Sequence, residues 1–317
     1  MSSNCSFPLK KETKIDMQNQ RAMIKVILKL KNNYIAVGSH GAVISIWNPD
    51  KKKMIQAWRA KGMVTDLLEL DNNDLIASCN GNNFENYISA YKYYNNEHTY
   101  KCINNISCNS MLSALVKIDD NKFICGTMDN TLIIFFKENN GSYKMEKNIK
   151  LEEKEDSDCI YSLIKLSNGN FISTGFSLIK LIDSSSFKIE KAIDFSEPSC
   201  LYEDSKKHIW TGNSPGNIII IDSELNKLKT INAHKFQINK FTEFNNNIIS
   251  ASTDFKMKIW NINSFECLQT INGYGEVTAL CLFSEGCLVT VQGIPQTDDI
   301  EDYDESDLLQ FLVFYEK

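Results

Sequence analysis

Residues Ile248–Asn261 read IISASTDFKMKIWN: an apolar pair, small residues, a turn centred on Asp254, and an alternating run that ends in Trp260. Six weaker copies occur along the 317-residue chain, beginning at Ile35, Leu75, Phe123, Phe171, Ile209 and Leu288. Successive copies start 38 to 48 residues apart. A period of about 40 residues built from strand-like units is typical of a β-propeller or a solenoid.

Each copy divides into four short strand-like runs. In the sixth copy these runs are Ile238–Phe241, Ile248–Ser252, Met257–Trp260 and Cys267–Ile271. The first two are separated by Asn245–Asn247, and Asn tolerates the left-handed backbone that tight hairpins require. Runs of this length between turns indicate antiparallel strands, and no segment shows a sustained helical period.

We therefore predict one all-β domain over residues 1–317, a seven-bladed propeller of four-stranded antiparallel blades. The last copy has only three strand-like runs, whereas residues 8–17 near the other end belong to no copy. We expect residues 8–17 to supply the outer strand of the last blade, because closure removes exposed sheet edges. The expected blades span approximately residues 22–60, 62–104, 110–150, 158–196, 198–233, 235–273 and 275–317.

Three positions in these copies resemble the WD-repeat (WD40) family. Trp47 and Trp260, each followed by Asn, stand where the family has Trp-Asp, and His234, preceded by Ala, stands where it has Gly-His. The resemblance covers roughly residues 20–317 and is most complete in the sixth copy. It implies a propeller fold and a divergent seven-repeat member of the family.

The resemblance also implies a buried, hydrogen-bonded set in the sixth blade, formed by His234, Ser252, Asp254 and Trp260. Ser250 is the alternative to Ser252, since both lie in the same strand. Buried polar groups of this kind are tolerated when they satisfy one another. A structural role is therefore expected for His234 in preference to a catalytic one.

Composition and charge narrow the range of partners. A net charge of −6 provides no overall basic field, so direct nucleic-acid binding is not expected. The ten cysteines form no C-x-x-C pair, which argues against zinc and favours a reducing, cytoplasmic compartment. No apolar run approaches the ~18–20 residues that span a bilayer, so membrane insertion is not expected.

The expected inner strands offer little catalytic chemistry. Over Ile24–Leu28 and its six counterparts, Asp66 is the only acidic residue and no His occurs. One carboxylate builds neither a metal site nor an acid–base pair, and no catalytic motif is present. We therefore expect no catalytic residue, no metal and no cofactor.

Two acidic segments depart from the repeat. The first contains Glu152, Glu153, Glu155 and Asp156; the second, within Gly293–Ser306, contains Asp298, Asp299, Glu301, Asp302, Asp304 and Glu305. The second segment lacks the residue order of an EF-hand calcium loop. In the resemblance both segments emerge on one rim of the ring, where they would attract a basic segment of a partner. The alternative is that they are merely solvated loops.

The expected function is a non-catalytic protein–protein interaction scaffold. It would be a subunit of a larger intracellular complex and would bind its partner through the rim that bears the acidic loops. A substrate receptor of a ubiquitin ligase that reads a basic peptide is an alternative within this class. A propeller enzyme is the alternative from a different class.

Overall fold

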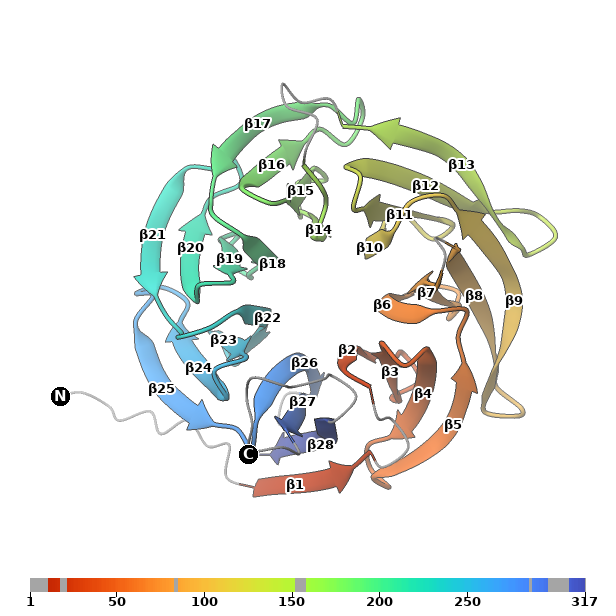
Figure 1. Ribbon diagram of the computed structural model, residues 1–317, viewed down its shortest axis with the longest axis horizontal. Helices are drawn as coiled ribbons and strands as arrows, with labels where there is room; N and C mark the ends of the chain where they lie inside the picture. Colours follow the sequence, from red (N-terminus) through yellow and green to blue (C-terminus); the bar gives the residue numbers. More distant parts are fainter. Residues whose placement is uncertain are drawn as a thin grey trace.

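The protein is described by a computed structural model that covers residues 11–17, 22–82, 85–151, 158–284, 287–295 and 308–316. Within these residues, 28 strands form seven four-stranded antiparallel sheets, and no α-helix occurs. The sheets are arranged around a common axis as the blades of a propeller (Figure 1). The predicted all-β, seven-bladed architecture is confirmed. We number the blades one to seven by the order of their inner strands in the chain.

Each blade has an inner strand beside the axis, a second strand, a third strand and an outer strand. The inner strands are β2 (Ile24–Lys29), β6 (Met63–Glu69), β10 (Leu112–Lys117), β14 (Ser162–Lys165), β18 (Pro198–Glu203), β22 (Ile238–Phe244) and β26 (Glu276–Ser284). The second strands are β3 (Ile35–Ser39), β7 (Leu75–Asn80), β11 (Lys122–Thr127), β15 (Phe171–Thr174), β19 (Ile209–Asn213), β23 (Asn247–Ser252) and β27 (Cys287–Pro295). The third strands are β4 (Val43–Asn48), β8 (Asn86–Tyr94), β12 (Thr131–Lys137), β16 (Leu178–Ile182), β20 (Asn217–Ile221), β24 (Lys256–Asn261) and β28 (Leu308–Glu316). The outer strands are β5 (Lys53–Arg59), β9 (Thr99–Cys108), β13 (Tyr143–Lys150), β17 (Ile189–Asp194), β21 (Lys227–Asn232), β25 (Cys267–Asn272) and, for blade seven, β1 (Lys11–Asp16).

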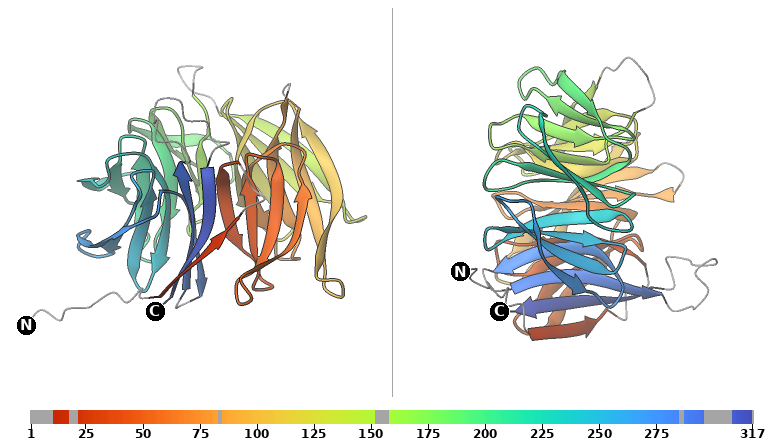
Figure 2. Two further views of the ribbon diagram at one scale, coloured as in Figure 1. Left: turned by 60° about the horizontal axis from the view of Figure 1, so that its bottom comes forward. Right: turned by 90° about the vertical axis from the view of Figure 1, so that its left-hand side faces the viewer.

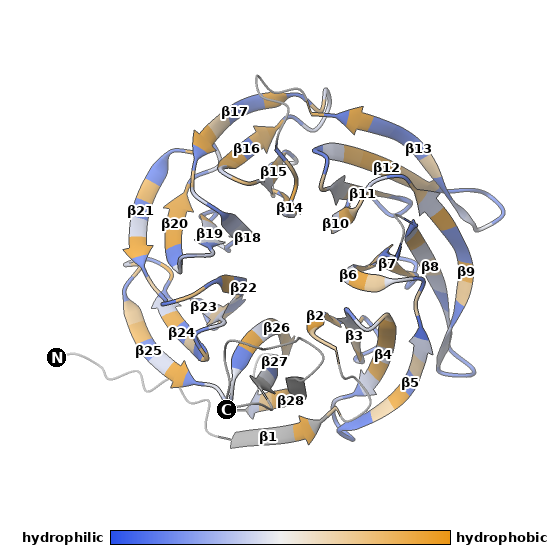
Figure 3. Ribbon diagram, viewed as in Figure 1, coloured by the Kyte–Doolittle hydropathy of each residue, from blue (hydrophilic) through white to orange (hydrophobic). Residues whose placement is uncertain are grey.

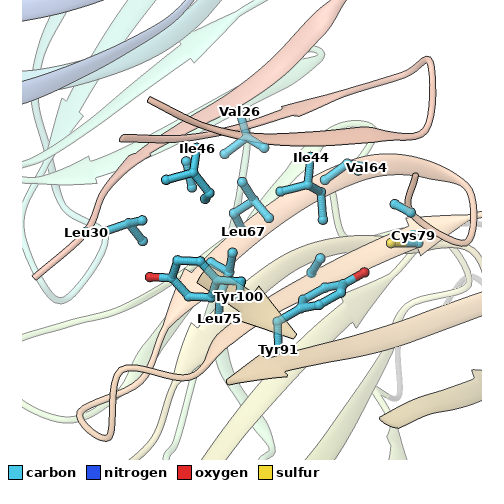
Figure 4. Close-up of a cluster of buried hydrophobic side chains, with 13 residues drawn as sticks. Val26, Leu30, Ile44, Ile46, Val64, Leu67, Leu75, Cys79, Tyr91 and Tyr100 are labelled. Atoms are coloured by element: carbon cyan, nitrogen blue, oxygen red, sulfur yellow. The ribbon is translucent and has the colours of Figure 1, made fainter. Parts of the chain in front are cut away.

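The hydrophobic core lies between neighbouring blades. Strands β3 and β7 are buried along their whole length, as expected for strands covered on both faces, whereas exposure alternates along the outer strand β5. Figure 3 shows the same contrast between the apolar strands β16 and β20 and the mixed outer strands. Between blades one and two, Val26 and Ile44 pack with Val64, Leu67 and Tyr100 (Figure 4).

Two pairs of adjacent blades approach closely where a glycine of a second strand faces the start of the next inner strand. A Cβ atom added to Gly38 would lie 2.5 Å from Cγ1 of Val64, and one added to Gly212 would lie 2.6 Å from Cβ of Ile238. Such distances are too short for real side chains in a close-packed interior. Glycine therefore sets how tightly the next blade can seat.

Side-chain amides link the outer strands of blades one to three. Gln56 Nε2 donates to the carbonyl of Tyr100 at 2.9 Å, and the Tyr100 amide donates back to Gln56 Oε1 at 2.8 Å. Asn104 and Tyr143 form the same reciprocal pair, at 2.8 and 3.1 Å. Each amide thus imitates one step of a β-ladder across a blade boundary.

The inner strands extend beyond their predicted ends. They contain Glu69, Glu203, Glu243 and Glu276 as well as Asp66, so the prediction of a single acidic residue is wrong. Glu203 accepts hydrogen bonds from the amide and hydroxyl of Ser167 at 2.8 Å each, and Glu243 accepts from those of Ser205 at 2.7 and 2.6 Å. Glu203 and Glu243 thereby join their inner strands to a turn of the preceding blade.

The N-terminal segment closes the ring. Strand β1 pairs antiparallel with β28, with Lys11 opposite Glu316, as predicted for the outer strand of the last blade (Figure 2). Met17, just after β1, is only 3% exposed and belongs to the same apolar cluster as Phe314. Pro8, where the predicted segment begins, lies outside the described residues.

We predict that removal of residues 1–17 destabilises the whole ring. It uncovers the edge of β28 and deletes the buried Met17 side chain, whose truncation alone costs about 2–5 kcal/mol in a core. Urea denaturation followed by circular dichroism should show a lower midpoint. Removal of residues 1–7, which spares the closing strand, is the control. An unchanged midpoint in the longer deletion would contradict the closure role.

Candidate partner-binding site

One end of the ring carries the connections between blades and the turns that follow the second strands. All inner strands begin at this end, which we call the top rim. Within it lies a cavity of about 750 Å³, lined by residues of blades one to six. Its volume falls in the range of roughly 300–1,000 Å³ that is usual for ligand sites.

Large apolar side chains from blades two, three and four form one wall of this cavity. They are Met63, Met111, Met128, Tyr161 and Phe176, and we call this set the apolar mouth. Met111 is 42% exposed and Phe176 is 51% exposed. The rings of Tyr161 and Phe176 meet edge to face, with centroids 5.3 Å apart. Clustered exposed apolar groups of this kind mark interaction sites.

Sequence reasoning missed the apolar mouth. The inner strands were predicted to begin at Val64 and Leu112, which left Met63 and Met111 one residue outside. A sequence signal nevertheless exists at the fifth residue after the start of each copy, where a large apolar residue stands in two copies. Phe176 stands five residues after Phe171, the start of its copy, and Met128 holds the same place in the third copy.

The rest of the top rim differs in character. Polar side chains of Glu197, Ser214 and Gln237 line the cavity on the side of blades five and six. Farther around the rim, Phe236 and Phe255 are also exposed. Phe255 has a φ of 65°, a left-handed conformation that is unusual for an aromatic residue.

One buried lysine fixes both ends of the first acidic segment, which lies between Leu151 and Asp158. Lys180 is fully buried, forms an ion pair with Asp158, and donates to Asn130 Oδ1 at 3.0 Å. Asn130 Nδ2 in turn donates to the Leu151 carbonyl at 3.1 Å, and Asp158 Oδ1 accepts from the Phe176 amide at 2.7 Å. A buried charge requires such partners. The network therefore holds the base of the acidic segment beside the apolar mouth.

The predicted acidic partner-binding residues themselves lie outside the described residues: Glu152, Glu153, Glu155, Asp156, Asp298, Asp299, Glu301, Asp302, Asp304 and Glu305. The strands that flank the second segment are described. Strand β27 ends at Pro295 and β28 begins at Leu308, so the second segment leaves and re-enters blade seven at the top rim. A role of these residues in partner binding stays a prediction.

The polar set of blade six is brought together around Ser250. His234 Nε2 lies 2.7 Å from Ser250 Oγ, which also accepts a hydrogen bond from Trp260 Nε1 at 2.9 Å. His234 Nδ1 lies 3.0 Å from Asp254 Oδ1. Ser252 accepts from the Asp254 amide at 3.1 Å instead. Ser250, and not Ser252, therefore connects the histidine to the tryptophan.

Strand pairing explains this difference. Trp260 is paired with Ile248, so Ser250 is its diagonal neighbour on the same face of the sheet, and Ser252 lies two residues farther away. Burial lowers the pKa of His234 against the opposing attraction of Asp254. Burial raises the pKa of Asp254, but hydrogen bonds from the Lys235 amide and from His234 outweigh it and leave that pKa below its ordinary value. The pair is thus a neutral imidazole held by a carboxylate.

The described part of the chain contains no group of three or more side chains placed to hold a metal ion. No helix within it is long and apolar enough to cross a membrane.

Comparison with known proteins points to one family. Residues 225–261, which include most of the sixth repeat, match the family described as WD domain, G-beta repeat. The WD repeat-containing protein 89 homolog of Dictyostelium discoideum is 40% identical to this chain over 57 residues. That match covers 17% of this chain and 16% of the relative, so it spans only a small part of the relative's length.

We predict that Trp260 is energetically coupled to Ser250 and not to Ser252. In a double-mutant cycle, Trp260→Phe and Ser250→Ala remove the same buried hydrogen bond, so their effects on the free energy of unfolding should deviate from additivity by about 0.5–1.5 kcal/mol. The matched cycle with Ser252→Ala should be additive within about 0.5 kcal/mol. Urea denaturation measures both. Equal coupling in the two cycles would contradict the assignment.

Proposed function

Because the chain is a WD-repeat protein, we propose that it is a non-catalytic interaction scaffold whose partner binds at the top rim. WD-repeat propellers generally mediate protein–protein interactions. In this chain the partner places an apolar side chain against Met63, Met111 and Phe176.

The composition of the apolar mouth supports this proposal. Methionine adapts its shape to varied partners, and aromatic residues and methionine are enriched at protein interfaces. Polar groups such as Glu197 and Gln237 flank the apolar wall. An apolar centre with a polar edge is the usual anatomy of a binding surface.

The two acidic segments extend this proposal. Their ends are attached at the top rim, so a basic stretch of the partner that follows its apolar anchor would meet them. Long-range attraction of this kind raises association rates. We further propose that the protein acts inside the cell as a subunit of a larger complex. None of the nine cysteines that the structure describes forms a disulfide, which suits a reducing compartment.

We predict that charges placed in the apolar mouth abolish partner binding. The double variant Met111→Asp, Phe176→Asp should lose the proteins that co-purify with the unaltered chain, because an apolar anchor cannot desolvate a carboxylate without cost. The matched control is Leu228→Asp, Leu268→Asp. These leucines are similarly exposed, at 45% and 51%, but lie on outer strands.

Affinity purification with mass spectrometry compares the variants, after circular dichroism has shown that each is folded. Retention of the partners by the mouth variant would overturn the proposed site. Equal loss of co-purifying proteins in the mouth variant and in the leucine control would also overturn the proposed site.

We predict that the second acidic segment accelerates association. Replacing Asp298, Asp299, Glu301 and Asp302 by their amides should slow partner association at low salt and have little effect at high salt, because screening shortens the electrostatic range to about 8–10 Å at physiological ionic strength. Association kinetics with the captured partner at two salt concentrations provide the measurement. An unchanged association rate at low salt would contradict the proposed role of the acidic segment in steering. It would not contradict docking at the apolar mouth.

A further inference from the structure

Below the mouth, a second cavity of about 470 Å³ follows the axis of the ring and is lined by inner strands of all seven blades. Its wall contains four lysines, namely Lys25, Lys117, Lys165 and Lys240, against one acidic residue, Asp66. The chain as a whole has a net charge of −6. The channel therefore concentrates positive charge inside a protein that is negative overall.

The single carboxylate in the channel is already engaged. Asp66 Oδ1 accepts a hydrogen bond from the Leu67 amide at 2.9 Å, and Asp66 Oδ2 accepts from the Leu115 amide at 2.8 Å. The second bond crosses from blade two to blade three. Asp66 is thus held against the wall by backbone donors, and it is the one acidic residue of the channel lining.

Lys240 is directed into the channel. Burial raises the pKa of Asp66 in blade two, of Cys200 in blade five and of Cys281 in blade seven, and the ammonium of Lys240 opposes the rise at all three. Lys240 also belongs to the lining of the channel, which agrees with an ammonium that faces the axis of the ring. Lys25 lines the same channel and also acts on Cys200.

Other groups add to this environment. Lys117 Nζ lies 2.6 Å from Asp71 Oδ2, and Lys165 Nζ donates to the Ile118 carbonyl at 2.8 Å, so both lysines remain at the lower end of the channel. In the wall, the buried hydroxyls of Ser113 and Thr278 have no hydrogen-bond partner among the described residues. Unpaired buried hydroxyls are costly, which favours a ligand that can accept hydrogen bonds.

We propose that the central channel binds a small phosphate-bearing anion, with Lys240 and Lys25 as its principal charged contacts. Lysine is a common phosphate ligand that acts as a point charge, and confined like charges gain most when a counter-charge enters. The channel volume suits a compact ligand with one or two phosphate groups. The two cavities share Lys25 and Tyr161 in their linings. Lys240 lines the channel and not the mouth cavity, whereas Met63, Met111 and Phe176 line the mouth cavity and not the channel, so substitutions can test the two proposals separately.

Calorimetric titration of the full chain with pyrophosphate, at low ionic strength, tests this site. We expect saturable binding with one anion per chain. Lys240→Gln should weaken binding about tenfold or more, and Lys240→Arg, which keeps the charge, should restore most of it. The matched control is Lys51→Gln. It removes the same charge from an exposed turn and should bind like the unaltered chain.

Lys240 is exposed to the channel, so its replacement leaves the core intact, and thermal unfolding confirms that each variant is folded. Absence of saturable pyrophosphate binding to the unaltered chain would overturn the proposal. Equal weakening by Lys240→Gln and Lys51→Gln would also overturn it, because the effect would then reflect net charge alone.

Discussion

The contact between the start of each inner strand and the second strand of the preceding blade governs the ring. Val64 seats on Gly38 and Ile238 seats on Gly212, at distances that leave no space for a Cβ atom on either glycine. This close approach sets the distance between the blades that it joins. It also brings every inner strand to the same channel, so the side chains beside these contacts become neighbours in space although they are far apart in sequence. The apolar mouth and the lysine-lined channel both result from this convergence.

The two candidate regions rest on supports of different kinds. The paired amides of Gln56 with Tyr100 and of Asn104 with Tyr143 tie blades one to three together at their outer edges. Buried Lys180 joins blades three and four through its ion pair with Asp158 and its hydrogen bond to Asn130. A rigid frame under exposed side chains lowers the entropy lost when a partner binds. The channel needs no such support, because seven inner strands surround it.

The repeat made the fold predictable because its signals are local. The Asn-rich turns require a left-handed backbone, which Asn33 and Asn246 adopt with φ of 61° and 57°. Ring closure was also predictable, because the last repeat has only three strand-like runs and residues 8–17 belong to no repeat.

The candidate sites were far less predictable. The network of Lys180 with Asn130 and Asp158 joins two blades, and no spacing in a single repeat reveals it. That Lys25 and Lys240 line the same channel likewise depends on where their inner strands meet around the axis. The choice between Ser250 and Ser252 required the pairing register, which the sequence leaves open. Features that a local sequence pattern encodes could therefore be predicted, whereas contacts between residues of different blades could not.

Ring closure by the first strand has a consequence for synthesis in the cell. Strand β1 leaves the ribosome before all the others, yet its partner β28 is the last strand of the described chain to emerge. At roughly 5–20 residues per second, the early segment waits for tens of seconds with its backbone donors and acceptors unpaired. Six blades can assemble in order during that interval, but the seventh is completed only after β28 has been synthesised. Until then both ends of the nascent arc present open sheet edges, which are prone to pair with other chains.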